Sequence, residues 1–113
     1  MAEQFIKNLD FAAVLPLAQQ VGYQKGQIVS KTLAQNKTLS LTLFAFDKGE
    51  EISSHESSGD AMLIALDGTG QITIDGEVFM LSAGETIVMP SQKPHAVFAA
   101  EQFKMFLIVV FPQ

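Results

Sequence analysis

The chain has 113 residues, the length of a single domain, and 48% of them are hydrophobic, which allows a core and excludes a disordered tail. Its net charge is −5 and its basic residues are all lysine, so no guanidinium is available for phosphate, and binding to nucleic acid or to an anionic membrane is disfavoured. The absence of cysteine excludes disulfide bonds and thiolate chemistry.

The N-terminal sequence shows no basic segment followed by a long apolar run, as a secretory signal would. The longest apolar run, Met105 to Phe111, is far shorter than the ~20 residues that a membrane helix needs. We therefore expect a soluble cytoplasmic protein with no membrane partner.

Residues 1–27 have no regular hydrophobic period and are predicted to form an arm that lies across the rest of the fold. Residues 17–21 can add one helical turn that ends near Gly22. The alternative is a strand pairing within residues 27–32.

From there the pattern becomes typical of β-structure, and residues 38–111 are predicted to form the barrel of one domain that covers residues 1–113. Asp75-Gly76 lies between two β-like runs and predicts a tight hairpin, because both central positions of a type I′ turn need a positive φ. The pattern gives roughly eight or nine strands and almost no helix, which indicates an all-β sandwich or barrel. The predicted strands cover residues 27–33, 38–46, 52–57, 61–66, 71–74, 77–81, 86–89, 95–99 and 103–111.

Two of these segments, 61–66 and 103–111, are apolar on both faces, although one face of a small two-sheet barrel should meet water. Cover by the N-terminal arm is one explanation. The other is a homodimer packed sheet against sheet. The residues that such a dimer would bury are Met62, Ile64, Phe106, Ile108 and Val110.

The stretch from Gly49 to His95 carries the residues that could perform chemistry. The only two histidines of the chain, His55 and His95, lie toward its two ends, and each follows a glycine turn and is predicted to open a β-like segment. If the intervening chain folds into antiparallel strands, the two imidazoles can meet in one cavity. A neutral pair of rings could both donate and accept, which suits a hydroxyl or carbonyl group of a small ligand.

Glycine, histidine and proline recur in this stretch with a spacing that resembles the two motifs of the cupin superfamily. The matching residues are Gly49, His55 and Gly68 in the first motif and Gly84, Pro90 and His95 in the second. The resemblance implies a double-stranded β-helix, or jelly-roll, cupin barrel with a short N-terminal arm.

Cupins usually bind a divalent metal, such as zinc, nickel, manganese or iron, through three histidines and one glutamate. At the matching positions this chain has Ser57 for the second histidine and Ala61 for the glutamate, so His55 and His95 are an incomplete metal-ligand set. The nearest carboxylate, Glu56, should point away from its neighbour in a strand.

We therefore expect a ligand pocket that is mostly apolar with a few convergent polar groups. Its predicted lining is His55, Ser57, Ala61, Leu63, Met89 and His95. Three functions remain open: a small-molecule-binding barrel with little or no dependence on metal, a metal-dependent dioxygenase or isomerase, and a structural or regulatory dimer with a vestigial pocket. No residue can be assigned a catalytic role.

Overall fold

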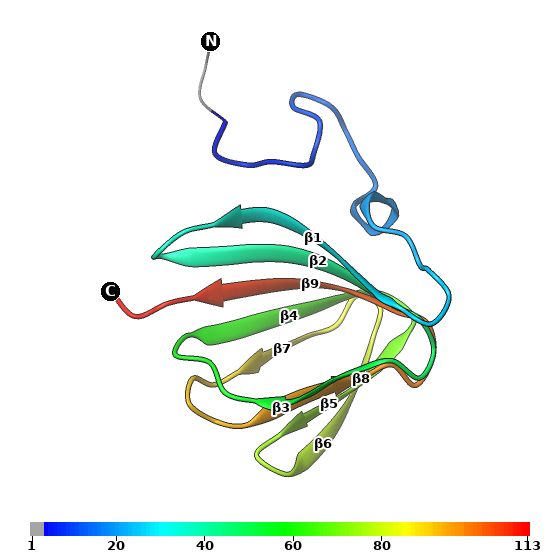
Figure 1. Ribbon diagram of the computed structural model, residues 1–113, viewed down its shortest axis with the longest axis vertical. Coiled ribbons are helices and arrows are strands. Elements are labelled where there is room, and N and C mark those ends of the chain that lie inside the picture. The colour runs from blue at the N-terminus through cyan, green and yellow to red at the C-terminus, as the bar shows by residue number, and fades with distance from the viewer. Residues whose placement is uncertain (1–3) are drawn as a thin grey trace.

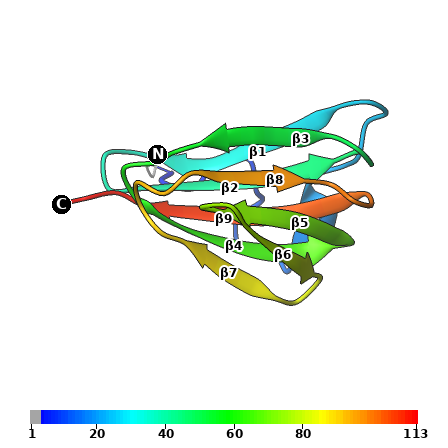
Figure 2. The ribbon, with the colours of Figure 1, turned by 90° about the horizontal axis from the view of Figure 1, so that it is seen from below.

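The computed structural model describes residues 4–113, so the first three residues of the predicted arm lie outside the described part of the chain. Two antiparallel sheets face each other and enclose the interior (Figures 1 and 2). The five-stranded sheet has the order β1-β2-β9-β4-β7, and the four-stranded sheet has the order β3-β8-β5-β6. This is the all-β jelly-roll barrel that the sequence predicts. No helix in residues 4–113 is long and apolar enough to span a membrane.

The strands begin and end close to the turn residues that the sequence displays. A short 3₁₀ helix, η1, precedes them. The element bounds are η1 Leu17–Gln20, β1 Ile28–Gln35, β2 Leu39–Phe46, β3 Glu51–His55, β4 Asp60–Asp67, β5 Thr69–Ile74, β6 Glu77–Ser82, β7 Thr86–Met89, β8 His95–Phe98 and β9 Phe103–Val110.

The predicted hairpin between β5 and β6 is confirmed. Asp75 and Gly76 have φ values of 49° and 85°, so both central residues adopt the left-handed conformation that this turn requires. The turn aligns Ile74 with Glu77 and Ile72 with Phe79, and this register places one side chain of each pair beside the other on the inner face of the sheet.

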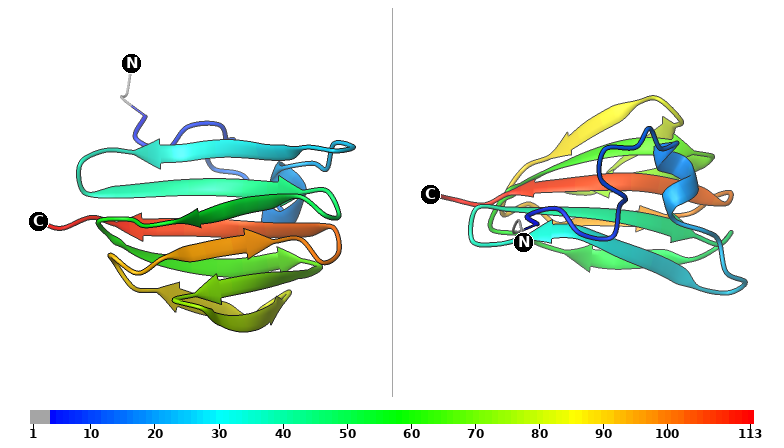
Figure 3. Two further views of the ribbon diagram at one scale, coloured as in Figure 1. Left: turned by 60° about the horizontal axis from the view of Figure 1, so that its bottom comes forward. Right: turned by 90° about the horizontal axis from the view of Figure 1, so that it is seen from above.

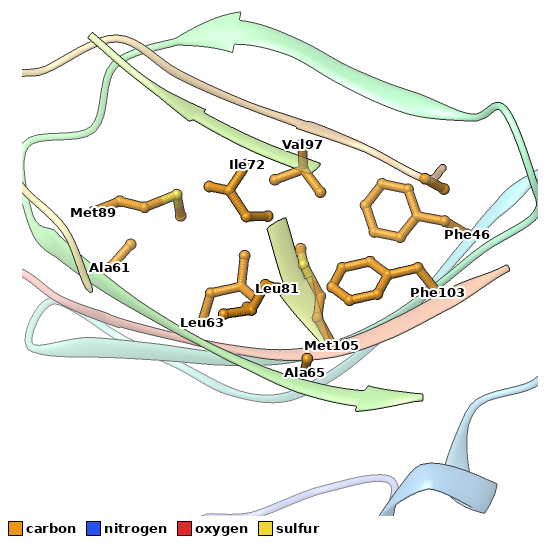
Figure 4. Packing of buried hydrophobic residues seen from close by; sticks show 11 residues of the cluster. Phe46, Ala61, Leu63, Ala65, Ile72, Leu81, Met89, Val97, Phe103 and Met105 are labelled. Carbon is orange, nitrogen blue, oxygen red and sulfur yellow. The ribbon is translucent and has the colours of Figure 1, made fainter. Parts of the chain in front are cut away.

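The interior is filled from one end by aromatic rings and along its length by aliphatic side chains (Figure 4). Phe46 and Phe103 are fully buried, with their ring centroids 6.0 Å apart. Gly70 lies directly against the Phe103 ring, and an added Cβ would come within 2.6 Å of a ring carbon. Each fully buried ring of this kind stabilises the fold by about 1.5–3 kcal/mol relative to an exposed one.

The arm and η1 cross the outer face of the five-stranded sheet (Figure 3). Val21 is buried there against Leu43 of β2, and Leu17 and Phe106 pack around the same cluster. Cover by the arm, one of the two explanations for the doubly apolar strands, therefore accounts for this part of the face.

Two lysines of the sheet hold η1 by its free carbonyl groups. The Nζ of Lys31 donates a hydrogen bond to the carbonyl oxygen of Gln20 at 2.9 Å, and the Nζ of Lys104 donates to that of Ala18 at 2.6 Å. The ammonium of Lys104 also lies 4.9 Å from the centre of the Tyr23 ring. Carbonyl groups at a helix end have no partner within the helix, so these cations satisfy them and fix the arm to the sheet.

Another part of the outer face is open to solvent. Met62 on β4 is 37% exposed, and its cross-strand neighbour Val88 on β7 is 55% exposed. Val110, at the end of β9, is 54% exposed. These residues include two of the five predicted for the dimer interface, and the homodimer stays a prediction.

Candidate functional site

A one-residue bulge places the two histidines side by side. Ile52 pairs with Val97 and His55 pairs with His95, so β3 advances three residues between these pairs while β8 advances two. The extra residue keeps both Ile52 and His55 on the face that His95 and Val97 share, which strict alternation would not allow. The ring centroids of His55 and His95 are 4.3 Å apart, and the ring planes meet at 67°.

One expectation about this pair is wrong. His95 opens β8 as predicted, whereas His55 is the last residue of β3 and opens nothing. The two strands run antiparallel, so the end of one meets the beginning of the other. His95 is buried, with 4% of its surface exposed, and His55 lies on the exposed side of the pair.

Backbone carbonyl groups fix the orientation of both rings. The Nδ1 of His55 lies 3.0 Å from the carbonyl oxygen of Ser53, and the Nδ1 of His95 lies 3.2 Å from that of Lys93. A carbonyl oxygen can only accept, so in each bond Nδ1 carries the proton. In a neutral ring the Nε2 atom is then a bare acceptor.

This arrangement corrects the expectation that a neutral pair would both donate and accept at the ligand. The donating nitrogen of each ring is already used within the protein. The Nε2 of His95 has no hydrogen-bond partner among the described residues, and no side-chain nitrogen or oxygen in that part of the chain is both buried and unpaired, so this atom still reaches solvent.

The environment of His95 disfavours its charged form. Burial lowers the pKa of His95 below its usual value, and the neighbouring His55 lowers it further through like-charge repulsion. The bond to the carbonyl group of Lys93 acts in the opposite direction and is the smallest of the three effects. The buried ring is therefore held in its neutral form at neutral pH.

A row of inward-facing residues leads from the ring pair across the four-stranded sheet. His95 pairs with Ile74 of β5, and Ile74 pairs with Glu77 of β6. Directly opposed residues lie about 4.5–5.5 Å apart, so the row from His55 to Glu77 spans roughly 15 Å.

At the far end of this row is a cavity of about 410 Å³, which we call the seam cavity because it lies where the edge strands β6 and β7 of the two sheets meet. Its size is typical of small-molecule sites. Its lining is Ile74, Asp75, Glu77, Phe79, Ile87, Val88, Pro90 and Lys93.

The other predicted pocket residues lie in the packed interior or in a loop. Ala61 and Leu63 of β4 are buried, and Met89 of β7 pairs with Ala61 across the strands. Figure 4 shows Met89 and Ala61 at the end of the core opposite the two phenylalanine rings. Ser57 lies in the loop after β3, where its Oγ accepts a hydrogen bond from the backbone N–H of Gly59 at 3.2 Å.

Sequence reasoning missed the seam cavity as a site. Glu77 and Phe79 belong to the predicted strand 77–81, and neither is among the predicted pocket residues. The sequence signal was present: the Asp75-Gly76 turn fixes the register of the hairpin, and strict alternation then puts Glu77 and Phe79 on the same inner face.

The residues present do not fit the metal that cupins usually bind. Within residues 4–113 no three histidine, cysteine, aspartate or glutamate side chains come together as a ligand set. Glu56 is exposed, and Asp60 faces the loop, where its Oδ1 accepts a hydrogen bond from the backbone N–H of Ser91 at 2.8 Å. Stable sites generally need at least three protein ligands, and the two Nε2 atoms are short of that number.

The fold and the ring pair together define a small jelly-roll barrel with a polar site at one end. Comparison with known families agrees, since the profile described as "Cupin domain" matches residues 42–111. The chain belongs to the cupin family.

Two solved structures that are more than 30% identical to this chain are described without an activity. A conserved protein of unknown function from Streptococcus pyogenes is 46% identical, with 100% of this chain and 99% of that chain covered and a TM-score of 0.97. A cupin superfamily protein from Desulfitobacterium hafniense is 33% identical, with 95% and 98% covered and a TM-score of 0.91.

A variant of the salicylate 1,2-dioxygenase of Pseudoaminobacter salicylatoxidans is 21% identical over 74% of this chain and 26% of that chain, with a TM-score of 0.68. Likeness at this level shows the fold alone. A comparison with curated proteins finds no significant match.

Proposed function

We propose that this protein binds a small molecule at the end of its barrel with little or no dependence on metal. The observation that carries the proposal is the ring pair, in which two imidazoles of fixed orientation have their ring centroids 4.3 Å apart, at the end of β3 and the beginning of β8. Fixing two rings in this way costs conformational freedom that a purely structural barrel would not need to give up.

The seam cavity supplies the apolar volume that such a ligand requires. Neither histidine lines the seam cavity, but Ile74 does, and Ile74 pairs with His95, so the cavity begins at the residue beside the ring pair. Apolar walls with a few polar groups at one end are typical of small-molecule sites.

Ligand-observed NMR with a library of small neutral and charged fragments tests the proposal. We expect fragments that bind the wild type and no longer bind His55→Ala. Because the His55 ring is exposed, its removal leaves the core filled, and a loss of binding reports on the site itself. Glu51→Ala is the matched control, since Glu51 lies on the same strand and pairs with Phe98 on the outer face.

Two results would favour the other functions. Stoichiometric metal in protein purified without a histidine tag, lost together with a reaction in His55→Ala, would support a metal-dependent dioxygenase or isomerase. Fragments that bind equally to the wild type and to His55→Ala, or that do not bind at all, would support a vestigial pocket.

We also propose that two copies pair through the uncovered part of the five-stranded sheet. Support comes from the exposed neighbours Met62 and Val88 and from Val110 on the same face. A buried charge without a partner is strongly unfavourable, so Met62→Glu should give a monomer in sedimentation velocity. Val78→Glu, on the outer face of the other sheet, is the control, and a wild-type monomer would contradict the proposal.

A further inference from the structure

The hydrogen bonds of the two imidazoles determine which ligand groups they can bind. Ser53 and Lys93 provide backbone carbonyl oxygens, which occupy Nδ1 of His55 and of His95 as acceptors. Each neutral ring therefore offers the ligand a lone pair on Nε2 and no N–H. A ligand atom that also has only lone pairs, such as a carboxylate oxygen, is an acceptor as well, so it cannot form a hydrogen bond with Nε2 and is repelled by it.

Protonation of His95 would relieve this clash, but the position of its ring opposes it. His95 is 4% exposed, and its ring centre is 4.3 Å from that of His55, so a second positive charge would form beside the first in a poorly hydrated place.

The charges around the seam cavity also disfavour an anionic ligand. Asp75 and Glu77 contribute two carboxylates to its lining, and Lys93 contributes one ammonium group. The Nζ of Lys93 lies 4.0 Å from a carboxylate oxygen of Asp75, and both side chains are more than half exposed, so this cation already faces an anion. The lining offers an anionic ligand no uncompensated cation.

We propose that this site selects ligands with O–H or N–H groups, either neutral alcohols and amides or organic ammonium ions, and rejects carboxylates. One end of the ligand donates to the Nε2 atoms of the histidine pair. The apolar body lies along Ile74 toward Phe79, and a second donor or a positive charge can reach Glu77. This inference rests on the proposed function and adds the chemical class of the ligand.

The first test needs no ligand. A long-range ¹H–¹⁵N spectrum of the imidazoles at pH 8 contains only two ring systems in an untagged protein, because the sequence has two histidines. We expect both rings to carry the proton on Nδ1, and the single variant His55→Gln assigns them. A ring with its proton on Nε2 would overturn the inference, since that ring would then offer a donor.

The second test compares three probes that share one aromatic body: benzyl alcohol, the benzylammonium ion and benzoate. We expect the first two probes to shift the Nε2 resonances. Benzoate should bind at least about tenfold more weakly than benzyl alcohol, because an acceptor buried without a partner costs about 1–3 kcal/mol. Benzoate that binds as tightly as benzyl alcohol overturns this inference and leaves the proposed function standing. Binding by none of the three overturns both.

The variant Glu77→Gln separates neutral from cationic ligands. It removes one charge from an exposed edge-strand residue and keeps its size, so the fold is unaffected. The probe 4-(hydroxymethyl)benzylammonium can donate its hydroxyl to the histidine pair and extend its ammonium group toward Glu77, and it should bind about twofold to fivefold more weakly to this variant, with benzyl alcohol unchanged. An equal loss for both probes would contradict the assignment of Glu77 to the cationic end.

Discussion

The two ends of the barrel are built from opposite kinds of residue. At one end Phe46 and Phe103 fill the interior, and Lys104 ties η1 over the outer surface. At the other end the inner face carries His55 and His95, and the strands give way to the loops that precede β4 and β8. We call these the closed end and the open end. The closed end resembles the core of a stable domain, whereas the open end places polar side chains on the inner face.

The difference has a physical consequence. Apolar side chains stabilise a fold in proportion to the surface they bury. A buried imidazole adds little stability, because its nitrogens must keep hydrogen bonds to the protein or to water. The closed end should therefore control unfolding, and the open end should control binding and the response to pH.

The largest effect should come from the closed end. Phe103→Ala removes a fully buried ring between Phe46 and Gly70 and should lower the free energy of unfolding by about 3–5 kcal/mol in urea denaturation followed by circular dichroism. Phe5→Ala removes the same ring from a position that is 77% exposed and should have less than about 0.5 kcal/mol of effect. Similar losses for the two variants would show that the closed end is not the centre of stability.

A smaller effect should follow from release of the arm. Lys104→Met removes the hydrogen bond to Ala18 and the contact with the Tyr23 ring, and should cost about 1–2 kcal/mol. Amide hydrogen exchange should accelerate in residues 17–21 and stay unchanged near His95. Lys37→Met, in the exposed β1–β2 loop, is the control. If amide exchange in the arm is unchanged in Lys104→Met, Lys104 does not hold the arm to the sheet.

The smallest effect should appear at the open end as a dependence on pH. Since the pKa of His95 is lower in the folded than in the unfolded protein, the unfolded chain binds more protons as the pH falls through the ordinary histidine value near 6.5. Stability should therefore decrease from pH 7.5 to pH 5.5, and this decrease should be smaller in His95→Gln. A stability that rises over the same interval would show that the folded protein favours the charged ring.

Much of the fold could be predicted because local sequence signals determine it. Asp75-Gly76 fixes a hairpin by its turn conformation, and the spacing of Gly49, His55, Gly84 and His95 resembles a family whose fold the chain shares. The meeting of the two imidazoles was expected if the chain between them folds into antiparallel strands, and β3 and β8 are such a pair.

The details that decide the chemistry could not be predicted in the same way. The bulge before His55 adds one residue to a polar run of serines, and no residue type there signals it. The bonds from Nδ1 end on backbone carbonyl groups, which every residue has, so their position depends on the folded path and not on residue identity.

The proximity of the two rings is the central claim, and the pKa of His95, measured by NMR titration in the wild type and in His55→Gln, tests it most directly. We predict a pKa below the ordinary value in the wild type and a partial rise in the variant, because the repulsion from His55 disappears while the burial of His95 remains. A pKa of His95 that is the same in both proteins would show that the rings do not sense each other, and would contradict the ring pair on which the proposed function rests.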